Sequence, residues 1–352
     1  MAEIQDKDKW YEFLRPLVNR LFGWSYRHIQ YVGKDNIPTD GAVILAPNHT
    51  NALCDALAIL TISLEPVVFV ARADMFKNSR AAWWLRWLKI MPIRRMRDGV
   101  QEVLHNDETE QKAINTLRDG VRFCILPEGT HRPKHSLLPL GKGIFRIALR
   151  ANEEFGSQKP VYIVPVGLEY ADYFHLWDAL TVNIGKPINV TDFVRKAHAQ
   201  YRQQHDEDMT DAQLILRMRE NLTMRMRELI MWVPDDEQYD ANWQQLRSNP
   251  PAPFSRFRKH EVPRAWVLLC LILLFPLALV SAVMSFPLGI STLIIRDKIK
   301  DPAFHNSIQF LMQFVLIPLM LFIPLPFWWI VQEYMYLVRQ FNRSAGNRLT
   351  EI

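Results

Sequence analysis

Residues 42–55, with the sequence AVILAPNHTNALCD, carry the clearest indication of both fold and chemistry in this chain. The apolar run at 42–45 has the character of a buried strand, and His49 follows just beyond its end. Asp55 comes six residues after His49. A carboxylate can hold an imidazole in one tautomer and raise its basicity, so the pair could act as a general base on a hydroxyl. The alternative is a helix-capping Asn48 followed by a solvated histidine and aspartate.

Short apolar runs alternate with helical patterns over residues 40–190. We expect strands at 42–45, 67–70, 122–126, 161–166 and 181–184, and helices at 53–63, 80–89, 108–118 and 144–154. This alternation predicts an α/β fold, with a mixed, largely parallel sheet flanked by helices. In such sheets the reactive groups gather in the loops at the carboxyl ends of strands, which is where His49 would lie.

A second motif, LPEGTHR at residues 126–132, also lies just past an expected strand. A glycine there lets the backbone approach a ligand closely, and successive amides can surround an anion. Glu128 could accept hydrogen bonds from a polyol, and the guanidinium of Arg132 could bind a phosphate with two parallel hydrogen bonds. An ordinary turn built on proline and glycine is the alternative.

Two further motifs carry candidate site residues or shape the strands beside them. The stretch MPIRRMR at residues 91–97 holds three arginines in four positions, which suits a phosphate or, alternatively, a solvated charged surface. The stretch IVPVG at residues 163–167 is an apolar strand that contains a proline. It could bend to shape a wall of the site, or it could be an edge strand.

Composition narrows the class of protein. The chain has 352 residues, 49% of them apolar, and a formal charge of +5, which is too small to indicate nucleic acid but fits anionic lipid or phosphorylated substrates. The three cysteines lie far apart and form no disulfide framework, so we expect a reducing compartment. His105, His131 and His135 show no metal-ligand spacing with one another or with a cysteine, so no metal is assigned. The N-terminus has no apolar region typical of a secretory signal.

The strongest membrane signal lies near the C-terminus. The apolar runs at 265–295 and 310–331 each exceed the roughly 20 residues that cross a hydrocarbon core of about 30 Å. A polar link at 296–302 would join them as a helical hairpin, and basic residues outside both runs place the two flanks in the cytoplasm. Several prolines interrupt the runs, so a re-entrant hairpin that does not fully cross is the alternative.

Two other segments combine aromatic and basic residues at helical spacing. They are residues 10–24, in an expected N-terminal amphipathic helix, and residues 80–89. Either could lie at a membrane interface or pack its rings in the core. Another expected helix, at 210–232, opens with Thr210 and Gln213 in a capping-box arrangement.

The order of the motifs NH-TNALC-D, PIRR, LPEGTHR and IVPVG resembles the PlsC-type glycerolipid acyltransferase superfamily, whose members acylate glycerol phosphates and lysophospholipids. The resemblance spans roughly residues 27–190 and includes a Gly-Lys-Gly sequence at 141–143 ahead of a helix. One departure is the spacing, because five residues separate His49 from Asp55 where the family usually has four. The longer spacing resembles a subgroup that includes fungal sn-1 acyltransferases.

The resemblance implies roles for the motif residues. His49 would deprotonate the acceptor hydroxyl, which would attack an acyl thioester of CoA or acyl carrier protein, and Asp55 would orient His49. The acceptor's glycerol and phosphate would be held by Glu128, Gly129, Thr130 and Arg132, together with Arg94 and Arg95. No cofactor is implied beyond acyl-CoA or acyl-ACP as the donor substrate.

The favoured acceptor is 1-acylglycerol 3-phosphate, with phospholipid synthesis as the setting. Alternatives are sn-1 acylation of glycerol 3-phosphate or dihydroxyacetone phosphate, acylation of another lysophospholipid or an aminoacyl lipid, and a non-catalytic membrane-anchored binding protein. We expect membrane lipids as partners, no nucleic acid, and a cytoplasmic membrane location with the catalytic domain facing the cytoplasm. The expected domains are a membrane-adjacent helix (1–30), an acyltransferase domain (31–233), a linker (234–264) and a membrane hairpin with tail (265–352).

Overall fold

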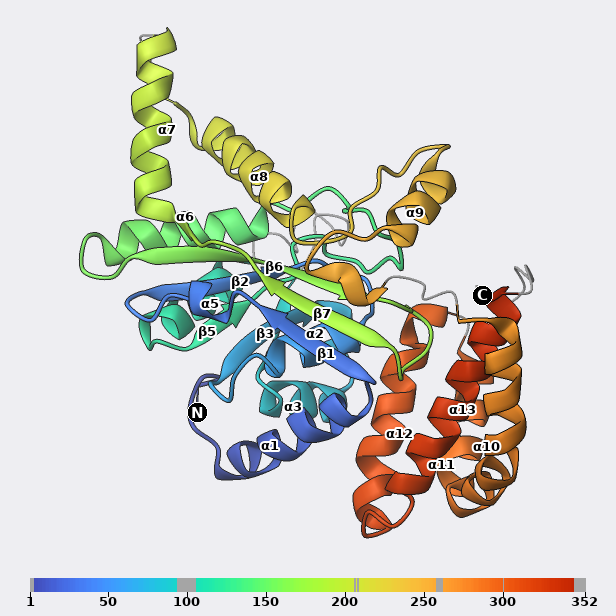
Figure 1. Cartoon of the computed structure of the whole chain (residues 1–352). Helices are drawn as coiled ribbons and strands as arrows, with labels where there is room; N and C mark the ends of the chain where they lie inside the picture. Colours follow the sequence, from blue (N-terminus) through green and yellow to red (C-terminus); the bar gives the residue numbers. More distant parts are fainter. Residues whose placement is uncertain are drawn as a thin grey trace.

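The computed structural model describes residues 3–93, 106–205, 207, 209–257, 262–299 and 301–344 (Figure 1). An eight-stranded sheet with the strand order β1-β7-β6-β2-β5-β3-β4 lies at its centre, and β8 pairs with β6. The strands are β1 (His28–Val32), β2 (Ala42–Pro47), β3 (Val67–Arg72), β4 (Ile90–Ile93), β5 (Arg122–Cys124), β6 (Val161–Tyr170), β7 (Ala179–Ile184) and β8 (Ile188–Asn189). β6 runs antiparallel to β7 and β8, and the remaining pairs are parallel. The predicted mixed, largely parallel α/β sheet is confirmed.

All five predicted strands are present, and β2 illustrates why the pattern was informative. Its residues alternate between two cores, with Val43 and Leu45 in one and Ala42, Ile44 and Ala46 in the other. Both faces of the strand are therefore buried, which gives the continuous apolar run seen in the sequence. The sequence did not predict β1, β4 or β8.

Pro165 lies inside the sheet, so the edge-strand alternative for the IVPVG segment is wrong. On one side Pro165 is in register with Ala46 of β2. On the other side of β6, the pairing with β8 ends at Ile163 and the pairing with β7 starts at Val166. Pro165 therefore falls in the gap between the two partner strands. The missing N–H therefore removes no ladder hydrogen bond, and the Pro165 carbonyl accepts one from Gly185 N–H at 2.9 Å.

Helices cover both faces of the sheet. They are α1 (Lys9–Trp24), α2 (Leu53–Leu60), α3 (Ser79–Trp87), α5 (Asn106–Arg118), α6 (Gly143–Phe155), α7 (Val190–His205) and α8 (Asp211–Arg227). α1 and α2 contribute to the first core, whereas α5, α6 and α8 contribute to the second. Thr210 and Gln213 form the predicted capping box at the start of α8. The segment predicted as a linker contains a further helix, α9 (Tyr239–Ser248).

The C-terminal region forms four helices instead of the predicted hairpin of two. They are α10 (Arg264–Met284), α11 (Phe286–Lys298), α12 (His305–Leu319) and α13 (Leu325–Ser344). Pro287 is the second residue of α11, and Pro324 directly precedes α13. A proline favours the first turn of a new helix over the interior of a continuing one. Within the described part of the chain, α10 is the one helix long and apolar enough to cross a membrane.

Candidate active site

The site is built where β2 ends and α2 begins. Nδ1 of His49 lies 2.8 Å from Oδ2 of Asp55, and the side chains are 18% and 0% exposed. His49 stands in the loop after β2, and Asp55 belongs to the first turn of α2. Because Nδ1 is engaged by the carboxylate, Nε2 is the nitrogen that can accept a proton from a bound hydroxyl.

The buried carboxylate of Asp55 accepts three further hydrogen bonds. Oδ2 accepts the backbone N–H groups of Thr50 at 2.8 Å and Asn51 at 2.7 Å. Oδ1 accepts the hydroxyl of Tyr170 at 2.8 Å. A charge withdrawn from water needs such compensation, and these donors also fix the carboxylate in one orientation toward His49.

A strained turn brings these groups together. Ala52, directly before α2, has φ 46° and ψ −120°, in a region that non-glycine residues rarely occupy. The turn points the N–H groups of Thr50 and Asn51 back at Asp55, so the loop folds around the carboxylate. Backbone strain of this kind persists where the surroundings enforce it, often at functional sites.

Glu128 lies beside this loop and contacts its backbone. Oε1 accepts the N–H of His49 at 2.7 Å, and Oε2 accepts the N–H of Leu138 at 2.8 Å. The carbonyl of His49 in turn accepts the N–H of Arg132 at 3.1 Å. Burial raises the pKa of Glu128 to about 7, although the two N–H groups that it accepts act in the opposite direction. The PEGT loop therefore holds the backbone of His49 through both its N–H and its carbonyl.

The other residues of this loop differ in how far they are engaged. Gly129 adopts φ 68°, closes a turn with Leu126 and is exposed, as is Thr130. The guanidinium of Arg132 donates to the carboxylate of Asp235 and, at 2.8 Å, to the hydroxyl of Ser136. Arg94 and Arg95 lie outside the described residues, directly after the end of β4.

Two residues next to the His49–Asp55 pair were not predicted from the sequence as site residues. Tyr170 is the last residue of β6, and the rule that reactive groups follow strand ends could have indicated it. The ring of His131 lies 5.4 Å from the ring of His49, and its Nε2 is 3.0 Å from Oδ2 of Asp301. No local signal in the sequence connects His131 with a residue in the polar link so far along the chain.

Asn48 does not cap a helix, contrary to the alternative considered above. Its amide Nδ2 donates to the Leu168 carbonyl at 3.0 Å, and its Oδ1 accepts the Leu168 N–H at 2.6 Å. The side chain thus continues the pairing of β2 with β6 beyond the last residue of β2. It thereby fixes the backbone position from which His49 projects.

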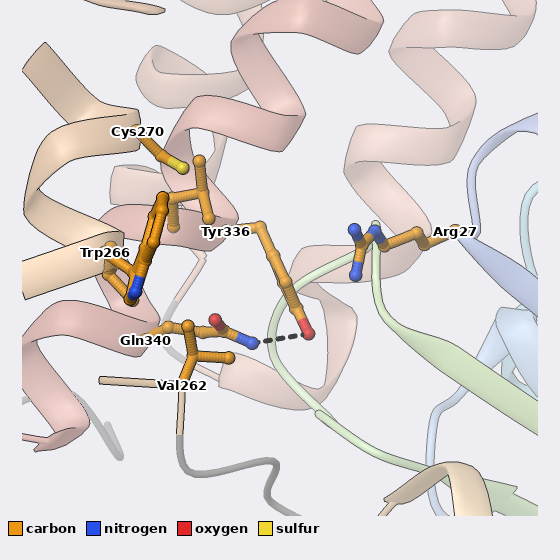
Figure 2. A pocket seen from close by; sticks show the side chains of 8 residues that line it. Arg27, Val262, Trp266, Cys270, Tyr336 and Gln340 are labelled. Carbon is orange, nitrogen blue, oxygen red and sulfur yellow. Dashed lines mark hydrogen bonds between the residues drawn. The ribbon is translucent and has the colours of Figure 1, made fainter. Parts of the chain in front are cut away.

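A pocket of about 290 Å³ lies elsewhere, between α10, α13 and the start of β1 (Figure 2). Trp266, Cys270 and Tyr336 contribute to its walls, and Gln340 donates to the Tyr336 hydroxyl at 2.7 Å. Neither His49 nor Asp55 lines it.

Comparison with known proteins is consistent with this geometry. Residues 28–169 match the protein-family model described as "Acyltransferase". A protein named 1-acyl-sn-glycerol-3-phosphate acyltransferase alpha is 24% identical in Mus musculus over 149 residues, which is 42% of this chain and 47% of that protein. Its Homo sapiens counterpart is 25% identical over 158 residues, covering 42% of this chain and 50% of that protein. The match thus spans about half the length of these relatives.

A solved structure is also similar. It is the crystal structure of the 1-acyl-sn-glycerophosphate (LPA) acyltransferase PlsC from Thermotoga maritima, which is 20% identical in sequence. The superposition covers 64% of this chain and 83% of that one, with a TM-score of 0.42.

Proposed function

We propose that this chain, which carries an acyltransferase-family domain at residues 28–169, moves a fatty acyl group from a CoA or acyl-carrier-protein thioester to a hydroxyl of a glycerol phosphate. The favoured acceptor is 1-acylglycerol 3-phosphate, in phospholipid synthesis. The observation that carries the proposal is the 2.8 Å contact between His49 Nδ1 and a fully buried Asp55. The names of the matched relatives support the choice of acceptor.

The reaction proceeds by direct transfer. Nε2 of His49 takes the proton of the acceptor hydroxyl while its oxygen attacks the thioester carbonyl. The new C–O bond forms, the C–S bond breaks, and the leaving thiolate receives the proton from His49. Asp55 keeps the imidazole in the required tautomer and stabilises its protonated form.

No covalent acyl-enzyme is required. Cys54, adjacent to Asp55 in the chain, is fully buried. Burial raises the pKa of its thiol to about 12, so it would not supply a thiolate nucleophile. The acceptor oxygen is therefore the nucleophile in this proposal.

In this proposal, arginine side chains hold the acceptor phosphate. Arg132 is one candidate, and it would have to exchange its hydrogen bond to Asp235 for the phosphate. Arg94 and Arg95 would supply further charge, while the exposed residues Gly129 and Thr130 would contact the glycerol. Glu128 contributes mainly by holding the backbone of His49.

The intact pair argues against a non-catalytic binding protein. The five-residue spacing between His49 and Asp55 favours sn-1 acylation as the second candidate, because it resembles that subgroup. For the location, we infer a cytoplasmic membrane with the catalytic domain on the cytoplasmic side, which the basic residues flanking the apolar runs support.

An acceptor panel tests the proposal. The purified protein would be given a labelled acyl-CoA or acyl-ACP with glycerol 3-phosphate, dihydroxyacetone phosphate, 1-acylglycerol 3-phosphate or other lysolipids. The highest kcat/KM should be for 1-acylglycerol 3-phosphate. Preference for glycerol 3-phosphate would establish the sn-1 alternative instead, and turnover unaffected by Arg94→Ala would indicate an acceptor without a phosphate.

A further inference from the structure

We propose that the four C-terminal helices form a membrane anchor inserted from the catalytic side only, as two helical hairpins whose tips end inside the bilayer. The first hairpin is α10 with α11, and the second is α12 with α13. The polar link between the hairpins then stays at the active site. This inference concerns lipid contact and topology, and it does not depend on the proposed acyl transfer.

The direction of each helix follows from its contacts. Arg264 and Phe275 of α10 contact Phe341 and Tyr334 of α13, so these two helices run antiparallel. Gly289, early in α11, lies near Trp328, early in α13. The chain therefore turns back after Met284, and α11 returns in the direction opposite to α10.

The return of α11 ends at the active site. Arg296, near its end, lies 3.2 Å from His305 at the start of α12. Between these two residues, Asp301 pairs with His131, whose ring contacts that of His49. The link is thus on the catalytic side of the membrane, not across it.

The start of α12 is fastened to the same side. Nδ2 of Asn306 donates to the Tyr173 carbonyl at 2.9 Å, and Ser307 lies 3.9 Å from the buried thiol of Cys54. Further along α12, Phe310 packs on Phe22 of α1. The second hairpin therefore also begins at the catalytic domain.

Two of the helices are too short to cross from this starting level. α11 has 13 residues and α12 has 15, which at 1.5 Å per residue gives lengths of about 20 Å and 22 Å. A hydrocarbon core is about 30 Å thick. The turns at Ser285 and at residues 320–324 would consequently lie within the bilayer.

The distribution of polar side chains fits lipid as the surroundings. No charged residue occurs at 265–295 or 306–332. Ser281, Thr292 and Gln313 are buried, with 0%, 5% and 4% exposure, and Gln313 faces the end of α1. Leucine, isoleucine, valine and phenylalanine side chains instead point outward, among them Leu273, Val283, Phe286, Leu293, Leu319, Leu321 and Ile323. Polar groups inside and apolar groups outside is the arrangement that a hydrocarbon solvent favours.

Some of the buried polar groups are hydrogen-bonded within the protein, whereas the hydroxyl of Ser281 has no hydrogen-bond partner among the described residues. Thr292 donates to the Leu288 carbonyl at 2.7 Å, and Ser285 to the Ser281 carbonyl at 2.8 Å. Ser25, directly after α1, donates to Gln313 at 2.6 Å. Contacts of this kind satisfy these side chains without water.

Single cysteines probed in membrane vesicles of both orientations test this topology. The background carries Cys270→Ala, which leaves only the fully buried Cys54 and Cys124. Leu321→Cys and Val283→Cys report on the two tips, and Lys298→Cys on the end of α11 beside the link. Glu153→Cys, on an exposed position of α6, marks the catalytic side.

With a membrane-impermeant maleimide, Lys298→Cys should label from the same side as Glu153→Cys. The two tip cysteines should label from neither side and should react after detergent solubilisation. Labelling of either tip from the side opposite Glu153→Cys would show that the chain crosses, and labelling from the same side would show that the tip is not inserted. Either result overturns the proposal, whether or not the protein transfers acyl groups.

Discussion

Asp55 holds Nδ1 of His49 at 2.8 Å across five intervening residues. The turn at Ala52 makes this possible, because its left-handed φ of 46° reverses the chain before α2 begins. Thr50 and Asn51 then donate their N–H groups to the same carboxylate oxygen that faces His49. The additional residue is accommodated in the turn and does not separate the pair.

The effect of replacing Ala52 on stability and turnover should depend on whether the new residue tolerates a positive φ. Ala52→Gly relieves strain on the order of 1 kcal/mol and loses one methyl group worth about 0.8 kcal/mol, so stability and turnover should change little. Ala52→Val places a β-branched residue at positive φ and should lower the thermal midpoint and turnover together. Equal behaviour of the two variants in thermal unfolding and acyl transfer would show that this turn does not constrain the site.

Tyr170→Phe should lower turnover about tenfold, which corresponds to roughly 1.4 kcal/mol. The reason is that the Asp55 carboxylate loses a hydroxyl donor at 2.8 Å. Without that donor the carboxylate is fixed less firmly toward His49, so the general base is less well positioned.

Tyr173→Phe is the matched control for Tyr170→Phe. It removes a buried hydroxyl 2.9 Å from His135, and no hydrogen bond to Asp55 is lost. The control should keep the turnover of the parent. Equal turnover of Tyr170→Phe and Tyr173→Phe would mean that the hydroxyl of Tyr170 does not position Asp55.

Glu128→Gln should alter how stability depends on pH. The pKa of Glu128 is about 7 in the folded chain and ordinarily 4.5, so between these values the folded state binds the proton more tightly. This group therefore favours folding below about pH 4.5, and its contribution is lost as pH rises through 7. Glutamine does not titrate, so from pH 5 to pH 8 the variant should gain stability relative to the parent, on the order of 2–3 kcal/mol.

Denaturant unfolding of the parent and Glu128→Gln in one detergent at both pH values measures this difference. Comparison of the two proteins removes the contribution of every other titrating group. A stability difference that stays constant between pH 5 and pH 8 would contradict a Glu128 that is protonated near neutrality.

The contact between Arg132 and Asp235 should govern affinity for the acceptor phosphate. Asp235→Asn weakens the competing partner, so KM for the phosphate acceptor should fall several-fold with kcat unchanged. Arg132→Gln should raise the same KM about tenfold or more. Asp236→Asn, an exposed neighbour, serves as the control for the loss of one surface charge. A higher KM in Asp235→Asn would mean that the ion pair serves the folded loop and not the phosphate.

The hydrophobic pattern of the sequence predicted the central strands of the sheet but not the edge strands β1 and β4 or the short strand β8. β2 and β6 are buried on both faces, so their apolar runs stand out in the sequence. β1 reads HIQYV and is only half-buried, and β8 has two residues, so neither gives such a run. These strands form because neighbouring strands offer unpaired backbone groups. That depends on the tertiary arrangement of the sheet and cannot be seen in the local sequence.

The same distinction applies to the C-terminal helices and the site. Hydropathy identified both apolar runs, but it does not report that the chain reverses at Ser285. That reversal is supported by contacts distant in sequence, such as Asp301 with His131. Likewise His49 and Asp55 are close in sequence, whereas Tyr170 reaches Asp55 only because β6 lies beside β2.

The most direct test of the central claim is acyl transfer by His49→Ala. With 1-acylglycerol 3-phosphate and a labelled acyl thioester, turnover should fall at least about 100-fold, the scale of general base catalysis, while the thermal midpoint stays close to that of the parent. His205→Ala, at an exposed position of α7, should retain full activity. Unchanged transfer by folded His49→Ala would contradict the assignment of His49 as the base.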